Sequence, residues 1–221
     1  MEIHNPLIVS LMNVSYFIEQ FVTGIQQTSW YEFVAVIAGV VSVWFSRKEN
    51  ILVYPIGLIN TTIYIFISFK YHLLGEASVN FYYTIMSIYG WLLWSKKDKH
   101  NQKSILQISY STKREWVWQL LFFGLFYTVI FFVLTLAKKS FAEGAIPWAD
   151  AFASATAYTG MWLMARKKVE SWWWWIATNI ASIPLYFIKS LVFTSFQYLL
   201  LLMLAIAGLY SWMQKAKYAK P

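Results

Sequence analysis

The stretch WWWWIATNIASIPLY, at residues 172–186, opens with four consecutive tryptophans and continues as an apolar run with an asparagine in its middle. An α-helix turns about 100° per residue, so two of the tryptophans share one stripe of this helix with the asparagine. The stripe, within an arc of about 80°, comprises Trp172, Trp175, Asn179, Ser182 and Tyr186. An unpaired amide in hydrocarbon is costly, so we expect the stripe to face protein or a wet cavity. It is either one wall of a ligand site or an aromatic belt with Asn179 as a contact between helices.

The composition places this stretch in a membrane protein. Of 221 residues, 59% are hydrophobic, 20% are aromatic and only 13% are charged, whereas soluble proteins average roughly 25% charged residues. The net charge of +8 is therefore a topology signal rather than evidence for nucleic-acid binding. The chain has no cysteine, which excludes disulfides, thiolate nucleophiles and cysteine-based metal sites. Residues 1–7 lack a basic region, so we expect no cleavable signal peptide.

Seven apolar segments are long enough to cross about 30 Å of hydrocarbon, which predicts an all-α membrane protein with seven transmembrane helices. The predicted spans are residues 31–46, 51–69, 76–95, 116–137, 148–165, 172–189 and 193–213. Residues 6–27 mix apolar side chains with Glu19 and several amides. We expect an amphipathic helix at the interface there; an additional span is the alternative, although a carboxylate is costly in mid-bilayer.

The distribution of lysine and arginine predicts the orientation. With seven spans, 14 of these residues lie on the side of the C-terminus and 4 lie on the opposite side. Basic loops stay in the cytoplasm, so the N-terminus is expected outside and the C-terminus on the cytoplasmic side. The membrane is expected to be the inner (plasma) membrane of a cell.

A repeat is visible at an offset of 118 or 119 residues. The matched pairs are Trp30 and Trp148, Asn60 and Asn179, Gly90 and Gly208, Trp94 and Trp212, and Lys97 and Lys215. The prediction is three spans, one linker span and three further spans in parallel orientation, with substrate bound between the repeats. The corresponding divisions are an interfacial helix at 1–29, a first repeat at 30–95, a cytoplasmic loop and linker span at 96–147, a second repeat at 148–213 and a tail at 214–221.

Other spans carry polar side chains that could complete a site with the first stripe. The third span places Asn80, Tyr83 and Ser87 on one face, and the second span carries Asn60. Amides both donate and accept hydrogen bonds, and aromatic rings stack on flat solutes. These residues predict a pocket for an aromatic solute that carries hydroxyl groups. At an offset of 119 the counterparts of the two stripe tryptophans are Val53 and Ile56, so the aromatic wall is expected on one side only.

The sequence lacks the groups that catalysis or energy coupling would need. There is no GxxxxGK[ST] motif for nucleotide hydrolysis. No carboxylate lies in the middle of a predicted span, where a proton or sodium relay would need one. The three histidines lie outside the spans and are scattered. We therefore expect no catalytic residues, no metal and no cofactor, and movement of the solute down its gradient.

These residues together resemble the PnuC family of vitamin transporters over about residues 30–212. The resemblance is carried by IYGW at 88–91 with Trp94, by GLIN at 57–60, by RKKVE at 166–170 and above all by Trp172-x-x-Trp175-x-x-x-Asn179. It implies facilitated uptake of nicotinamide riboside, trapping of the substrate by a cytoplasmic kinase, a SWEET-like architecture and assembly as a homotrimer. The resemblance also implies that Trp172, Trp175 and Asn179 contact the substrate.

Two positions depart from the family pattern. Asn80 stands where many relatives have glutamine, and Ser87 stands where some have asparagine. Branches of the family transport thiamine or riboflavin, so a thiamine transporter is the alternative. A membrane-embedded enzyme acting on lipids would need a nucleophile and base that the spans lack. A scaffold or receptor component could use only the 96–115 stretch as a soluble surface.

Overall fold

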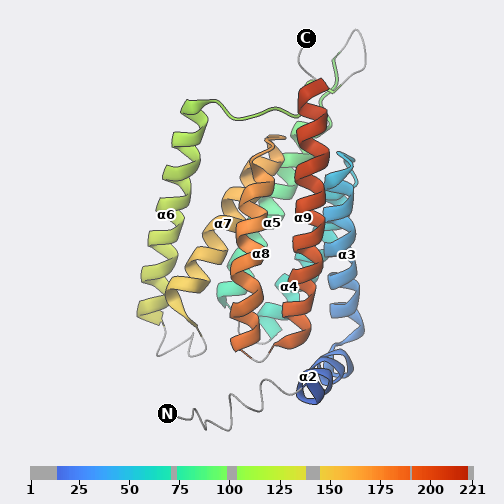
Figure 1. Cartoon of the computed structure of the whole chain (residues 1–221), viewed down its shortest axis with the longest axis vertical. Helices are drawn as coiled ribbons and strands as arrows, with labels where there is room; N and C mark the ends of the chain where they lie inside the picture. Colours follow the sequence, from blue (N-terminus) through green and yellow to red (C-terminus); the bar gives the residue numbers. More distant parts are fainter. Residues whose placement is uncertain (1–13, 71–73, 99–103, 138–144, 190, 219–221) are drawn as a thin grey trace.

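The computed structural model describes residues 14–70, 74–98, 104–137, 145–189 and 191–218 (Figure 1). Within these residues the chain forms eight α-helices and no sheet, apart from two isolated β-bridges. The helices are α2 (Val14–Gln27), α3 (Trp30–Arg47), α4 (Val53–Lys70), α5 (Leu74–Trp94), α6 (Lys113–Ala137), α7 (Pro147–Ala165), α8 (Ser171–Ile188) and α9 (Val192–Tyr218).

Helices α3 to α9 coincide with the seven predicted ranges, with corrections at their ends. Helix α6 begins three residues before the predicted 116, because the Thr112 and Glu115 side chains cap each other's backbone N–H at 3.3 and 2.8 Å. Helix α9 continues five residues beyond the predicted 213, since its polar end needs no hydrocarbon to remain helical. Of the predicted interfacial helix at 6–27, residues 6–13 lie outside the described residues, and α2 begins at Val14.

Helices α3 to α9 run side by side as a bundle, and α2 lies beyond one end of it, against α9 (Figure 1). Phe21 on α2 packs on Phe193 and Phe196 of α9, with ring centroids 5.7 and 5.3 Å apart. Helix α6 stands at the edge of the bundle and packs mainly on α7.

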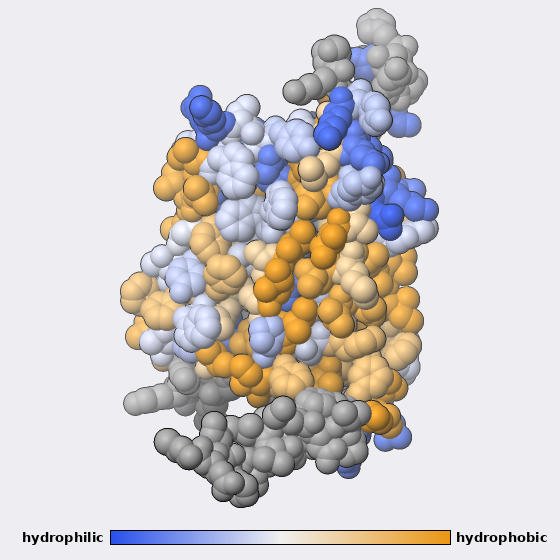
Figure 2. Space-filling model, viewed as in Figure 1, coloured by the Kyte–Doolittle hydropathy of each residue, from blue (hydrophilic) through white to orange (hydrophobic). Residues whose placement is uncertain are grey.

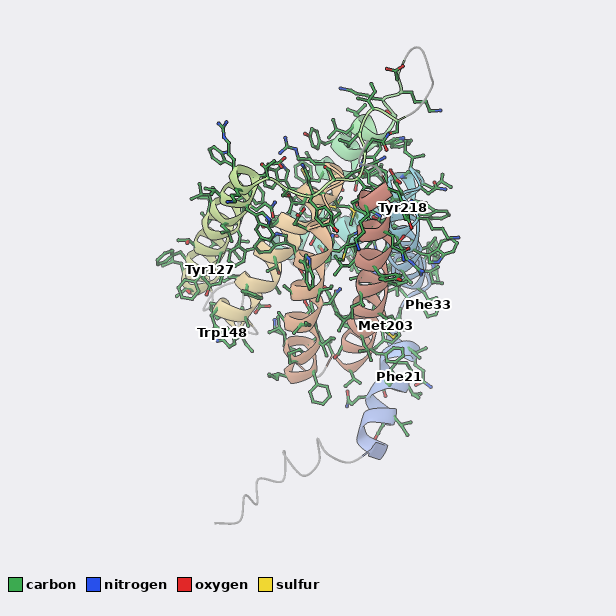
Figure 3. The ribbon with its side chains drawn as sticks, turned by 45° about the horizontal axis from the view of Figure 1, so that its top comes forward. Phe21, Phe33, Tyr127, Trp148, Met203 and Tyr218 are labelled. Atoms are coloured by element: carbon green, nitrogen blue, oxygen red, sulfur yellow. The ribbon has the colours of Figure 1, made fainter. Side chains whose placement is uncertain are left out.

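On the face shown in Figure 2 the side of the bundle is largely apolar, and most of the strongly polar side chains are gathered at one end. Large side chains project outward from the helices (Figure 3), among them Phe33, Trp148 and Met203, which are 44%, 64% and 53% exposed. Four helices within the described residues are long and apolar enough to cross a membrane: α3, α4, α6 and α9. The surface is therefore suited to lipid rather than water.

The core at the polar end is built from contacts that recur between the two halves at an offset of 118 or 119 residues. The Trp94 Nε1–H donates to the carbonyl of Ala165 at 3.1 Å, and the Trp212 Nε1–H donates to the carbonyl of Ser46 at 3.1 Å. Trp94 is the last residue of α5 and Trp212 lies six residues before the end of α9, and each ties its helix to the end of the first helix of the other half. The Ser46 hydroxyl also reaches the sulfur of Met164, 118 residues along the chain, at 2.9 Å.

Candidate functional site

Helix α8 presents its polar stripe to the protein interior, as its helical phase predicts. Trp172, Asn179 and Ser182 are at most 3% exposed, whereas Trp173, on another face, is 54% exposed. Trp174 also turns away from the stripe, and its Nε1–H donates to the side chain of Gln119 on α6 at 3.2 Å. The stripe is thus not an aromatic belt at the surface, because only one of the four indoles is mostly exposed.

Trp175 lies between α7 and α5. A methyl group added at Gly160 would lie 3.2 Å from the Trp175 ring, so the indole rests against the α7 backbone where a side chain is missing. On the other side the Trp175 ring meets Tyr83, with centroids 6.3 Å apart and planes inclined by 49°. Tyr83 in turn meets Tyr158 edge to face at 6.2 Å. The three rings form an aromatic cluster in mid-bundle, contributed by α5, α7 and α8.

Asn179 places a buried amide one helical turn from Trp175. The residue is only 3% exposed, and the structure shows no hydrogen bond to its side chain from any described residue. Because residues four apart share a helix face, the amide and the Trp175 ring are presented in the same direction. Such a group is suited to a polar ligand that supplies the missing hydrogen bonds.

Trp172 plays a different part from Trp175. It is 1% exposed, its ring meets Trp212 edge to face at 5.5 Å, and it fills the space left by Gly208. Its Nε1–H is buried without a partner among the described residues. Trp172 is therefore a core residue that lies nearer the polar end of the bundle than the aromatic cluster.

The structure gives Trp172 a counterpart in the first half of the chain, 118 residues earlier. Tyr54 is 1% exposed, meets Trp94 edge to face at 5.1 Å and fills the space left by Gly90. The expectation that neither stripe tryptophan has an aromatic counterpart is therefore wrong for Trp172. For Trp175 the position at the same offset is Gly57, so at Trp175 the two halves do differ.

In the register that pairs Trp172 with Tyr54, the residue that matches Asn179 also shifts by one position. At an offset of 118 the counterpart of Asn179 is Thr61, and both are buried, at 3% and 4% exposed. Asn60 has a partner of its own: its Nδ2–H donates to the carbonyl of Ala35 on α3 at 2.7 Å, beside Gly39. Asn60 thus joins α4 to α3, and its amide nitrogen is occupied.

The remaining predicted site residues lie on α5 and at the far end of α8. Ser87 is 3% exposed and faces α4 across Gly57, at 3.9 Å from a methyl group built there. Asn80 is half-buried, and its backbone carbonyl accepts a hydrogen bond from the Thr84 hydroxyl. The Thr84 hydroxyl also lies 2.9 Å from the Thr61 hydroxyl. Tyr186 stacks on Tyr198 of α9 with centroids 5.1 Å apart and an angle of 13°. The predicted residues therefore extend over the length of the bundle rather than into one small pocket.

Tyr158 was not anticipated from the sequence. It packs face to face with Tyr82 at 4.2 Å, and its carbonyl accepts a hydrogen bond from the Tyr82 hydroxyl at 3.0 Å. Helix α7 is buried along most of its length because small residues dominate AFASATAYTG at 151–160. A run of small residues in an apolar helix is a signal of close packing, and it could have marked α7 as the central helix of the site.

The arrangement can hold a flat ring against aromatic side chains and orient it with a few amide and hydroxyl groups. Among the described residues, no three histidine, aspartate or glutamate side chains gather as a metal site would require.

Comparison with known proteins finds relatives over nearly the whole chain. The model of a family described as nicotinamide mononucleotide transporter matches residues 29–214. The nicotinamide riboside transporter PnuC of Escherichia coli (strain K12) is 26% identical over 208 residues, which are 86% of this chain and 87% of that protein. The riboflavin/roseoflavin transporter RibM of Streptomyces davaonensis is 23% identical over 199 residues, or 90% of this chain and 92% of that protein.

A solved structure has the same fold. The crystal structure of the vitamin B3 transporter PnuC matches with a TM-score of 0.68 at 22% identity, covering 100% of this chain and 95% of that one.

Proposed function

Because the chain belongs to the nicotinamide mononucleotide transporter family, we propose that it moves nicotinamide riboside across a membrane by facilitated diffusion. The membership confirms the resemblance inferred from the sequence. The protein is a multi-pass membrane transporter of a small vitamin-type substrate, and its relatives are transporters rather than enzymes.

One observation carries the choice of site. The Trp175 and Tyr83 rings are in contact, and the buried Asn179 lies one helical turn from Trp175 on the same face of α8. A nicotinamide ring would stack on the indole, and the carboxamide or ribose hydroxyls would hydrogen-bond Asn179. Tyr158 would complete the aromatic wall, while Trp172 would support the stripe from the polar end of the bundle. Ser87, Asn80, Asn60 and Tyr186 remain proposed contacts further along the path.

The substrate is the finer part of the proposal. Nicotinamide riboside is favoured by the E. coli relative, which carries that name. Thiamine and riboflavin are the alternatives, the second because RibM is also similar to the chain. All three combine a flat ring with hydroxyl groups, so the aromatic cluster alone suits each of them. The residues that would choose among them are the hydrogen-bonding ones, Asn179, Asn80 and Ser87.

We propose seven spans of the inner membrane in a three-one-three arrangement. The C-terminus lies on the cytoplasmic side, and α2 lies at the outer interface. The arrangement is supported by the Trp94 and Trp212 hydrogen bonds that recur across the two halves. The helices α5, α7 and α8 are less apolar than the four candidate spans, and they carry most of the polar and small residues of the site. Assembly as a homotrimer and trapping of the substrate by a cytoplasmic kinase are part of the same proposal.

Uptake by the purified protein in liposomes tests this function. We expect radiolabelled nicotinamide riboside to equilibrate across the membrane without ATP or an ion gradient. Radiolabelled thiamine and riboflavin, assayed separately, measure selectivity. Flux that requires an imposed ion gradient would refute facilitated diffusion, and flux of thiamine alone would transfer the assignment to the alternative.

A further inference from the structure

We propose that a groove between α6 and α7 binds one anionic phospholipid, with its phosphate on Arg114 and Arg166. The groove lies at the polar end of the bundle, which is called the basic end from here on. The groove has a volume of about 580 Å³ and lies outside the aromatic cluster. It has a charged mouth and an apolar length, which is the chemistry of a lipid rather than of a soluble anion.

The mouth of the groove carries a surplus of positive charge. It contains Arg114, Arg166 and Lys168, with Glu115 as its carboxylate. Glu115 is engaged by Lys168 at 2.9 Å. Neither arginine forms an ion pair with any carboxylate in the described part of the chain. Two exposed guanidinium groups are thus available, and guanidinium is well matched to phosphate oxygens because it donates two parallel hydrogen bonds.

Arg166 is held in place by an aromatic floor. Its guanidinium carbon lies 5.5 Å from the centroid of the Trp162 ring. The Trp162 ring is stacked on Phe122 at 4.9 Å and 21°. A guanidinium that rests on a packed indole loses less side-chain entropy on binding than a free one. A second hollow, of about 340 Å³, also includes Arg166, Lys168 and Glu115, so the charged group can be approached from both sides of Arg166.

The length of the groove matches one leaflet. Below the arginines, α6 lines it with Trp118, Leu121 and Leu125, which are 56%, 57% and 62% exposed. From Arg114 to Leu125 a helix rises by about 16 Å, close to half of the roughly 30 Å of hydrocarbon in a bilayer. An acyl chain can therefore lie along the groove while its phosphate stays at the basic end. Anionic lipids are attracted to basic residues at the cytoplasmic surface by about 1 kcal/mol per residue.

Lipid binding to the purified protein in detergent tests the proposal, with dioleoylphosphatidylglycerol and dioleoylphosphatidylcholine as probes. Native mass spectrometry measures occupancy, and the thermal unfolding midpoint measures stabilisation. We expect tighter binding of phosphatidylglycerol. The double variant Arg114→Gln/Arg166→Gln should weaken it by about 5-fold per arginine, the fold-change that 1 kcal/mol corresponds to. The matched control Lys96→Gln/Lys217→Gln removes two exposed charges near the same end and should bind as the wild type does.

A second variant tests the apolar length of the groove. Leu121→Ala/Leu125→Ala should reduce the advantage of dioleoyl over dihexanoyl phosphatidylglycerol, while millimolar inorganic phosphate should not compete with the long-chain lipid. Equal losses in the arginine variant and its control would overturn the site. Full competition by phosphate would identify a soluble-anion site instead. Dissociation of an oligomer in the arginine variant, with unchanged lipid binding, would mean that a second copy of the chain covers the groove.

Discussion

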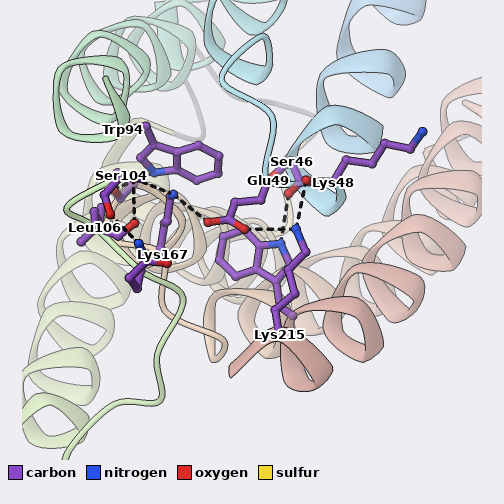
Figure 4. Close-up of polar contacts among 11 residues, drawn as sticks. Ser46, Lys48, Glu49, Trp94, Ser104, Leu106, Lys167 and Lys215 are labelled. Carbon is purple, nitrogen blue, oxygen red and sulfur yellow. Dashed lines mark hydrogen bonds and ion pairs between the residues drawn. The ribbon is translucent and has the colours of Figure 1, made fainter. Parts of the chain in front are cut away.

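Glu49 and Lys167, 118 residues apart, form an ion pair of 2.7 Å across the two halves of the bundle (Figure 4). They are also the two non-glycine residues with positive φ in the described chain, at 61° and 52°. This conformation costs about 1–3 kcal/mol and persists where the surroundings enforce it. Lys167 lies 4.8 Å from the Trp94 ring centroid, and Glu49 also pairs with Lys215 at 3.0 Å. The pair therefore lies where the matching loops of the two halves meet.

Removing the two partners should have unequal effects. Glu49→Gln leaves the Lys167 ammonium, only 4% exposed, without a carboxylate, and we expect a loss of about 3 kcal/mol of stability. Lys167→Met should cost less, because Glu49 keeps Lys215. The half-exposed Lys215→Gln should cost about 1 kcal/mol or less. Thermal unfolding in detergent measures the order, and an effect of Glu49→Gln no larger than that of Lys215→Gln would contradict it.

Substitutions in the aromatic cluster should affect binding. Trp175→Ala and Asn179→Ala should each weaken binding of nicotinamide riboside by roughly 1–3 kcal/mol, or about 5- to 150-fold. The first loses ring stacking, and the second loses hydrogen bonds to the ligand. Trp173→Ala is the matched control, because its indole is on the same helix but 54% exposed. Calorimetric titration measures the affinities. Wild-type affinity in both variants would return the stripe to a packing role.

Gly160→Ala should affect the cluster without removing any of its side chains. The added methyl would lie 3.2 Å from the Trp175 ring, so the indole must shift by a few tenths of an ångström. We expect affinity to fall about 5-fold, equivalent to roughly 1 kcal/mol, with a smaller change in the unfolding midpoint. Titration of the variant beside Trp175→Ala measures both effects. An affinity equal to that of the wild type would show that the ring position is not decisive.

Gly90→Ala and Gly208→Ala should destabilise the protein to a similar degree. Each methyl would lie within 3 Å of a buried ring, that of Tyr54 or that of Trp172, and overpacking of this kind costs about 1–3 kcal/mol. Gly124→Ala is the control: nothing lies within 4 Å of its methyl, and alanine favours a helix by about 0.5–1 kcal/mol over glycine. Unfolding midpoints compare the three. A large effect at only one of Gly90 and Gly208 would contradict the equivalence of the two contacts.

The absence of cysteine allows the orientation to be measured directly. We expect Ser95→Cys, at the basic end, to react with an impermeant maleimide only in inside-out vesicles. Leu191→Cys, at the opposite end and 48% exposed, should react only in intact cells. The reverse pattern would invert the proposed topology.

Much of the candidate site could be predicted from helical periodicity. Which residues share a face depends only on the turn per residue, so the sequence alone is enough to group Trp172, Trp175 and Asn179. Tyr158 could not be added to them, because nothing local shows that α7 brings it against Tyr83. Asn60 illustrates the same point: its position in a span is visible in the sequence, but its bond to the Ala35 carbonyl depends on how α4 packs on α3.

The sequence by itself determined the class of protein, the ranges of the helices and the family, because composition, apolar length and motif spacing are properties of the chain alone. Only the tertiary structure decided the register between the halves. In that register Trp172 is equivalent to Tyr54, and Asn179 is equivalent to Thr61. In the sequence, four of the five matched pairs lie at an offset of 118, whereas the asparagines match at 119. Packing separates them, because a shift of one residue rotates every side chain by about 100° around its helix and away from the glycine that receives its ring.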